Sequence, residues 1–204
     1  MNYPAASGRG IEKTNKFRAE SVRLQEYDYS MEGAYFVTIC TKERKECFGQ
    51  VVNNVIQLSK IGITVDKYWH EVPEHFPSVI LDEYIVMPNH MHGIIIINYN
   101  YYNNPRRDVA MQRLYHRNKQ RPKNYQMSMI SPKPQSLSVI IRSYKSICTR
   151  EINRYQNHLH FQWQPRFYDH IIRNEHALQQ IQEYIIDNPL NWKKDRNHVE
   201  NLYI

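Results

Sequence analysis

Residues 84–97 read YIVMPNHMHGIIII and combine a turn signal, two histidines and a run of aliphatic residues. Pro88 and Asn89 supply the turn chemistry, and the apolar residues on both sides are typical of two strands joined as a hairpin. Because strand side chains alternate between two faces, His90 and His92 are expected to point to the same face. Imidazole is the commonest metal-ligating side chain near neutral pH. The pair therefore offers two converging metal ligands from one rigid strand.

The apolar pattern around this hairpin predicts an α+β domain. Its order, β-α-β-β-α-β followed by a last helix, is typical of a ferredoxin-like antiparallel sheet with helices on one face. The C-terminal helix carries a candidate tyrosine. The expected strands are residues 34–41, 79–87, the histidine strand and 161–172, and the expected helices are residues 59–70, a segment from Ser136 onward and 175–188, with Ser59 and Asn174 as N-caps.

The length of 204 residues and the content of 41% hydrophobic and 23% charged residues favour one globular domain. We expect a mobile lead-in over residues 1–20, a domain over 21–193 with a basic insert over 98–135, and a tail over 194–204. No apolar run approaches the roughly 20 residues that cross a bilayer, and the N-terminus lacks the apolar part of a secretion signal. Three cysteines without CxxC spacing argue against a disulfide framework. These features favour a cytoplasmic protein without a membrane partner.

The excess positive charge of the chain is concentrated in the insert. The formal net charge is +7, and residues 98–135 hold eight basic residues and one acidic residue. Such clustering is typical of proteins that bind a phosphate backbone, so a nucleic-acid partner is expected. A solvated basic loop without a dedicated partner is the alternative. The basic residues are Arg106, Arg107, Arg113, Arg117, Lys119, Arg121, Lys123 and Lys133, and the acidic residue is Asp108.

A tyrosine and an asparagine near the end of the last expected helix are further candidates. Tyr184 and Asn188 lie in QEYIIDNP, and their i, i+4 spacing places them on one helix face, one turn apart. Ala177 and Ile181 continue this face, which indicates that it turns toward the body of the protein. An inward amide needs a partner such as a metal ion, and a tyrosine can act as a covalent nucleophile. The alternative is that Tyr184 is a packing aromatic and Asn188 a polar residue at a helix end.

Three segments resemble the REP-associated tyrosine transposases, which belong to the single-tyrosine HUH transposases that act on single-stranded DNA. The segments are residues 21–41, 84–97 and 161–192. PNHMHG is similar to the HUH motif of this family, and YIIDNP is similar to its tyrosine-helix motif. The family also implies the ferredoxin-like fold.

The resemblance implies a role for each candidate residue. His90 and His92 match the metal ligands of the family, Asn188 its third ligand and Tyr184 its nucleophile. Other branches often have Gln at the third position. The implied cofactor is a divalent metal, Mg²⁺ or Mn²⁺. The implied activity is metal-dependent nicking and joining of single-stranded DNA through a 5′-phosphotyrosine intermediate, with a hairpin-forming repeat as the partner.

Three other functions stay open. A domesticated, non-catalytic DNA-binding or regulatory protein would keep the fold, but the intact set of candidate residues disfavours it. A replication initiator or relaxase would share the histidine pair, but the short chain lacks a helicase segment. A metallohydrolase with an H-x-H pair would need further His or Asp ligands, for which the sequence shows no pattern.

Basic and aromatic residues outside the insert are candidates for DNA contacts. Arg and Lys bind phosphates, and aromatic rings stack on unpaired bases. A solvated basic face is the alternative. The candidates are Arg142, Lys145 and Arg150 on the helix after the insert, and Trp163 and Arg166 at the start of the last strand.

Other histidines and tyrosines are expected to be incidental. Tyr144 lies on an apolar helical stripe and is expected in the core. Tyr168 lies in a strand beside His170, which is expected to be a packing histidine, with a DNA-contacting group or a partner of a site residue as the alternative. A second H-x-H pair, His158 and His160, lies in the polar run RYQNHLHFQ and is not expected to bind metal.

Overall fold

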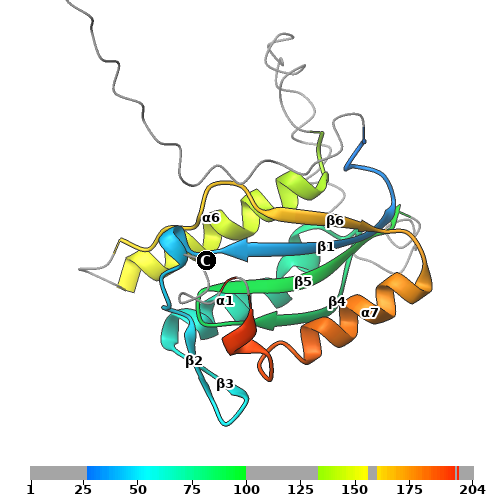
Figure 1. Ribbon diagram of the computed structural model, residues 1–204. Coiled ribbons are helices and arrows are strands. Elements are labelled where there is room, and N and C mark those ends of the chain that lie inside the picture. The colour runs from blue at the N-terminus through cyan, green and yellow to red at the C-terminus, as the bar shows by residue number, and fades with distance from the viewer. Residues whose placement is uncertain (1–26, 100–132, 156–159, 196, 198–204) are drawn as a thin grey trace, which may run out of the picture.

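A four-stranded antiparallel sheet forms the centre of the protein (Figure 1). The computed structural model describes residues 27–99, 133–155, 160–195 and 197. The strand order is β4-β5-β1-β6. The strands are β1 (Gly33–Cys40), β4 (Val79–Val86), β5 (His90–Ile97) and β6 (Tyr168–Ile172). The helices are α1 (Lys60–His70), α2 (Val72–His75), α6 (Leu137–Tyr155) and α7 (Glu175–Ile186), with short 3-10 helices η1 (Lys42–Arg44) and η3 (Trp192–Lys194).

The α+β, ferredoxin-like fold expected from the sequence is confirmed. β4 and β5 form the expected hairpin around Pro88 and Asn89. Ser59 and Asn174 cap α1 and α7, because their side chains accept hydrogen bonds from the backbone N–H groups of Gly62 and Ala177. The amphipathic pattern and its N-caps therefore predict the beginnings of these two helices correctly.

A small hairpin of β2 (Gly49–Val52) and β3 (Val55–Leu58) is absent from the sequence expectation. Each of its strands has four residues, which is too short for a clear alternation. Its turn residues Asn53 and Asn54 have φ of 52° and 62°. Two-residue hairpins favour such positive φ values, and Asn tolerates them. The Asn-Asn pair is the sequence signal for this turn.

The last strand is shorter than the expected 161–172, because β6 begins at Tyr168. Pro165 has no N–H for pairing, and Arg166 has φ of 66°, a left-handed conformation that interrupts a strand. Trp163 forms an isolated bridge with Thr41. Residues 161–167 therefore contact the end of β1 without extending the sheet.

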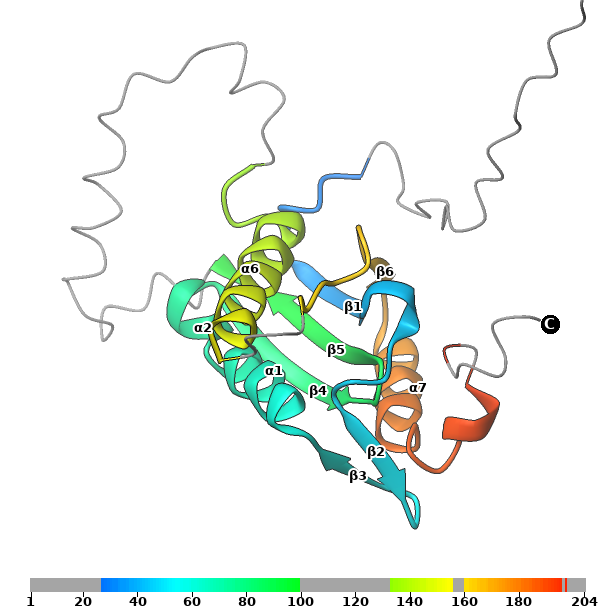
Figure 2. The ribbon, with the colours of Figure 1, turned by 90° about the vertical axis from the view of Figure 1, so that its left-hand side faces the viewer.

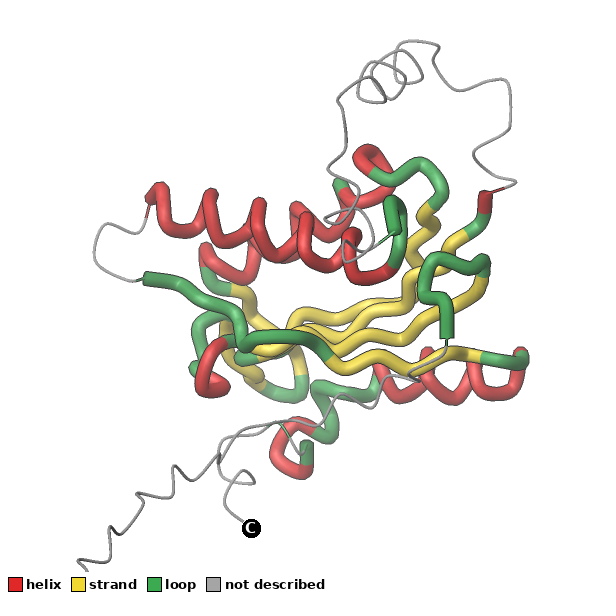
Figure 3. The backbone as a smooth tube through the Cα atoms, turned by 90° about the horizontal axis from the view of Figure 1, so that it is seen from above, coloured by secondary structure: helices red, strands yellow, loops and turns green. Residues whose placement is uncertain are grey.

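Helices cover both faces of the sheet, which corrects the expectation of helices on one face. α1 and α6 lie on one face and α7 on the other (Figure 2), and Figure 3 shows the same layers from above. Tyr35 and Val37 belong to the core under α1 and α6, whereas Phe36 and Ile94 pack with Ile185 of α7. Strands that are apolar on both faces need cover on both. As a consequence, α7 covers the face that carries the histidine pair.

No helix in the described part of the chain is both long enough and apolar enough to cross a membrane. The expected lead-in over residues 1–20 and residues 100–132 of the expected insert lie outside the described residues. His158 of the second H-x-H pair lies outside them as well.

Candidate metal and nucleophile site

His90 and His92 lie side by side on β5 and are fully buried. Their Nε2 atoms are 3.0 Å apart. The outer ring nitrogens have oxygen partners: His90 Nδ1 lies 2.8 Å from Asn89 Oδ1, and His92 Nδ1 lies 2.9 Å from Thr38 Oγ1. Both rings are therefore oriented through their Nδ1 atoms, and their Nε2 atoms point to one common position.

The hydrogen bonds of Asn89 determine which ring nitrogen of His90 carries the hydrogen. Asn89 Nδ2 donates to the backbone oxygens of Arg44 and Asn197, so its Oδ1 faces the imidazole. Because an amide oxygen accepts and cannot donate, His90 Nδ1 carries the hydrogen and Nε2 of the neutral ring carries a lone pair. An outer partner of this kind is typical of metal-ligating histidines.

The spacing of the two nitrogens fits a divalent cation. If His92, like His90, carries its hydrogen on the outer nitrogen, two lone pairs face one another at 3.0 Å, and a proton or a cation between them would relieve their repulsion. Neighbouring ligands in an octahedral site, with metal–ligand distances of about 2.1 Å, lie about 3.0 Å apart. The pair can therefore occupy two adjacent positions around such an ion.

Asn188 lies at the same site but beyond the end of its helix. The sequence pattern extends the helix to residue 188, whereas α7 ends at Ile186 and the backbone N–H of Asn188 donates to Ile185 O in the following turn. The side chain is still buried. Its Oδ1 has no hydrogen-bond partner among the described residues. A buried amide oxygen in this state is costly, and a metal ion would satisfy it.

Asp195 is a site residue that the sequence pattern does not identify. One ligand atom each from Asp195, His90 and His92 lie within 4.8 Å of one another, and all three residues are buried. Asp195 belongs to the expected tail over residues 194–204, where no motif or period marks it. Its place in the site results from the chain path after α7.

Tyr184 reaches the histidines from α7. Its hydroxyl lies 3.2 Å from His92 Nε2 and donates to Asp195 Oδ2 at 3.4 Å. Its ring makes edge contacts with His92 and Phe36. The residue is 44% exposed and lines a cleft of about 820 Å³ together with Asn188. A phenol with access from solvent beside residues that could hold a metal ion has the placement that nucleophilic attack on a phosphate requires.

Acidic groups dominate the charge of this cleft. Glu183, Asp187 and Asp195 line it, opposed by Lys194. Its potential therefore favours a cation and opposes a phosphate that arrives without one. A bound divalent ion would offset this acidic charge and place a positive charge beside Tyr184.

Two other tyrosines occupy different environments. Tyr144 is buried and donates to Val65 O at 2.9 Å, and burial raises its pKa well above the ordinary value. Its expected place in the core is confirmed. Tyr168 lines the same cleft as Tyr184, so an experiment on the nucleophile must separate the two. His170 is exposed, which corrects its expected packing role, and His160 is exposed as well.

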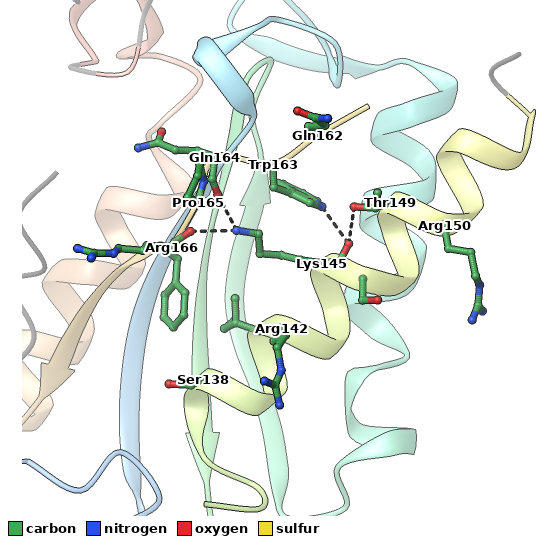
Figure 4. A pocket seen from close by; sticks show the side chains of 13 residues that line it. Ser138, Arg142, Lys145, Thr149, Arg150, Gln162, Trp163, Gln164, Pro165 and Arg166 are labelled. Carbon is green, nitrogen blue, oxygen red and sulfur yellow. Dashed lines mark hydrogen bonds between the residues drawn. The ribbon is translucent and has the colours of Figure 1, made fainter. Parts of the chain in front are cut away.

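The residues expected to contact DNA all line one groove, of about 720 Å³, between α6 and residues 162–167 (Figure 4). The groove lies on the α6 side of the sheet, whereas the histidines face α7. Among the described residues that line it, none is acidic. Three of the candidates are exposed: Arg142, Arg150 and Arg166.

The ring of Trp163, which is expected to contact DNA, is covered by the protein itself. Trp163 is 8% exposed, packs against Phe48 and Phe161, and donates from Nε1 to Lys145 O at 3.1 Å. This ring stabilises the groove wall from within the core.

Lys145 is also engaged with the protein itself. Its Nζ donates to the backbone oxygens of Gln164 at 2.7 Å and Arg166 at 3.0 Å. Burial lowers its pKa to about 8. Lys145 therefore holds residues 164–166 in place, and Arg142, Arg150 and Arg166 are the exposed candidates in the groove.

Comparison with known proteins assigns the chain to a family, although not through a family model. No family model matches it. An uncharacterized protein of Haemophilus influenzae is 34% identical over 194 residues, which cover 92% of this chain and 99% of that protein. The two proteins belong to one family.

A solved structure of a REP-associated tyrosine transposase bound to a REP hairpin has the same fold. It matches with a TM-score of 0.52 and 18% identity over 85% of this chain and 76% of that chain. This match confirms the fold that the sequence resemblance implies.

Proposed function

We propose that the protein is a transposase-type enzyme that nicks and joins single-stranded DNA with a divalent metal ion. The observation that carries the proposal is the Tyr184 hydroxyl, 3.2 Å from His92 Nε2 and at the edge of an open cleft. This position combines access for a DNA strand with proximity to metal ligands. The motifs PNHMHG and YIIDNP and the shared fold support the same reaction.

The metal ion would be held by His90, His92 and Asn188, through two imidazole nitrogens and one amide oxygen. When bound, Mg²⁺ or Mn²⁺ supplies Lewis-acid polarisation of the scissile phosphate. Asn89 and Thr38 hold the outer nitrogens of the two imidazoles. The two histidine ligands are therefore oriented before any ion binds.

Tyr184 would carry the covalent step. Its oxygen attacks the phosphorus, and the bond from phosphorus to the 3′ oxygen of the preceding nucleotide breaks. The phenolic proton passes to solvent in the cleft, and the leaving 3′ oxygen takes up a proton there. The products are a 5′-phosphotyrosine and a free 3′-OH. A second 3′-OH can reverse the step and join the strands without ATP, because one phosphodiester bond forms for each one broken.

The proposed partner is a single DNA strand that forms a hairpin. The transposase of similar fold was solved with a REP hairpin. Arg142, Arg150 and Arg166 line the groove on the α6 side, where their guanidinium groups would bind phosphates. Because this groove and Tyr184 lie on opposite faces of the sheet, the groove would hold DNA that is distant from the scissile phosphate.

Covalent capture tests the proposed reaction. The full chain is incubated with Mn²⁺ or Mg²⁺ and labelled, hairpin-flanked single-stranded DNA, and then denatured. We expect an adduct that survives denaturation, fails to form with a chelator, and yields a DNA-linked peptide that contains Tyr184. DNA binding without any adduct would contradict the proposal and favour a non-catalytic DNA-binding protein.

Replacing Arg142 and Arg166 together by glutamine is expected to weaken DNA binding and to reduce its salt dependence. Each lost phosphate contact reduces the slope of log K against log salt by about 1, so the double variant should lose about 2. Fluorescence anisotropy at several salt concentrations measures the slope. Arg154→Gln, on the same helix but outside the groove, is the control and should leave the slope unchanged. A double variant with the wild-type slope would exclude the groove as a DNA site.

A further inference from the structure

We infer that Asp195 is a ligand of the same divalent ion, alongside His90 and His92. The inference rests on the proposed function, because it concerns the ion that the histidines would hold. It assigns a role to the segment after α7, which lies beyond the motif YIIDNP.

The position of the carboxylate carries the inference. Asp195 offers an oxygen within 4.8 Å of the ligand nitrogens of both histidines, and the residue is 8% exposed. A carboxylate in a buried site is costly unless a cation or hydrogen bonds compensate it. Mg²⁺ and Mn²⁺ prefer oxygen ligands, and carboxylates are their usual protein ligands.

The charge of the proposed ligands also supports Asp195 as a ligand. Two neutral imidazoles and the amide of Asn188 carry no charge, so they leave the two positive charges of the ion uncompensated in a buried site. Asp195 would neutralise one of these charges. The remaining positive charge would attract the phosphate of the DNA strand into a cleft that is otherwise acidic.

Residues before and after Asp195 in the chain contact the histidine strand and hold Asp195 near the histidines. Trp192 is buried, with its ring centroid 5.8 Å from that of His90. Asn197 accepts a hydrogen bond at its backbone oxygen from Asn89 Nδ2 at 2.8 Å, and Asn89 in turn orients His90. The backbone N–H of Asn197 also donates to Asp195 Oδ1 at 2.5 Å. The carboxylate is thus oriented by the same neighbours that orient His90, as expected for a ligand of one metal site.

Asn188 supports this ligand and can still bind the ion itself. Its Nδ2 donates to Asp195 Oδ2 at 3.4 Å. Its Oδ1 has no hydrogen-bond partner among the described residues, so it is available as a neutral ligand. One amide can therefore steady the carboxylate and contribute an oxygen.

Mn²⁺ binding by the DNA-free protein tests the inference without reference to activity. Isothermal titration calorimetry gives the Kd for Mn²⁺. Asp195→Asn keeps the shape of the side chain and removes its charge, and we expect Kd to rise about tenfold or more. Asp187→Asn is the matched control, because Asp187 is an exposed acid of the same cleft, and its Kd should stay within about threefold of wild type. His90→Ala should abolish binding, and thermal unfolding without metal confirms that each variant is folded.

The outcomes distinguish this inference from the proposed function. If Asp195→Asn binds Mn²⁺ as wild type does while His90→Ala does not, Asp195 is no ligand and the proposed metal site stands. If the wild type binds no Mn²⁺, both the inference and the proposed site are wrong.

A second variant provides a direct spectroscopic signal. Thiolates favour soft metal ions, so Asp195→Cys should bind Cd²⁺ and give a thiolate-to-Cd²⁺ ultraviolet absorption at one equivalent. Adding His92→Ala should reduce that absorption, and Asp187→Cys should not show it. The wild type already has a thiol near the site, because Cys40 of β1 pairs with His90 of β5. Its absorption with Cd²⁺ is therefore the background for this measurement. An Asp195→Cys spectrum equal to this background would contradict the inference.

Discussion

A Tyr184→Phe variant is expected to form no covalent adduct with DNA, while it still binds Mn²⁺ and the hairpin substrate. The substitution removes the one oxygen that would attack the phosphate and keeps the ring contacts with Phe36 and His92. Loss of a covalent nucleophile costs about 10³-fold or more in rate. The lost hydrogen bonds, at 3.2 and 3.4 Å, are partly exposed, so the free energy of unfolding should fall by less than about 1 kcal/mol.

Tyr168→Phe is the matched control for this experiment. Tyr168 lines the same cleft, and its ring also contacts Phe36. Denaturing gels measure the adduct. Mn²⁺ titration and fluorescence anisotropy show that each variant still binds Mn²⁺ and the hairpin DNA. We expect Tyr168→Phe to retain the adduct. Loss of the adduct in Tyr168→Phe, or its presence in Tyr184→Phe, would remove Tyr184 from the role of nucleophile.

Gly93→Ala is expected to destabilise the fold by roughly 1–3 kcal/mol, because it overpacks the core. A Cβ atom at Gly93 would lie 2.4 Å from Trp69 Cζ2 and 3.1 Å from two further atoms of that ring. Trp69 is fully buried, and the rings of Tyr84 and Tyr144 lie against it, so it has little space to move. Gly93 directly follows His92, so a shift of β5 would also displace this proposed ligand and is expected to weaken Mn²⁺ binding.

A double-mutant cycle with Trp69→Phe checks the cause of this effect. The smaller ring creates space for the new methyl group, so the double variant should be more stable than the sum of the two single effects predicts, by about 1 kcal/mol. Urea denaturation of the three variants and the wild type gives the four free energies of unfolding. Effects that add within about 0.5 kcal/mol would show that the two positions do not clash.

Local pattern predicts most of the elements, and it fails where the backbone departs from regular geometry. Apolar periodicity and the caps Ser59 and Asn174 identify α1 and α7 because both signals act within a few residues. β2 and β3 have four residues each, so their alternation is lost among ordinary loop sequence. The expected last strand begins too early because the left-handed conformation of Arg166 leaves no signature in an apolar pattern.

The candidates for DNA contacts also show what the sequence can and cannot predict. Trp163 has the residue type of a base-stacking platform, but its exposure depends on Phe48 and Phe161, which come from other parts of the chain. Arg142 and Arg166 lie 24 positions apart in the printed sequence and meet at one groove only through folding. Residue type alone therefore identifies the charge of the surface but not its shape.

The sequence by itself determines that His90 and His92 share one face, because side chains two residues apart in any strand point the same way. It also identifies Tyr184, through the motif YIIDNP, as the candidate on the last helix. Tertiary structure decides that α7 covers the histidine face, which brings the Tyr184 hydroxyl within 3.2 Å of a residue 92 positions earlier. It also decides that Asp195 joins them, through the turn after Ile186 and the packing of Trp192 on His90. The physical reason is that backbone geometry sets a local period, whereas the path of a turn and the choice of a sheet face depend on every packing partner at once.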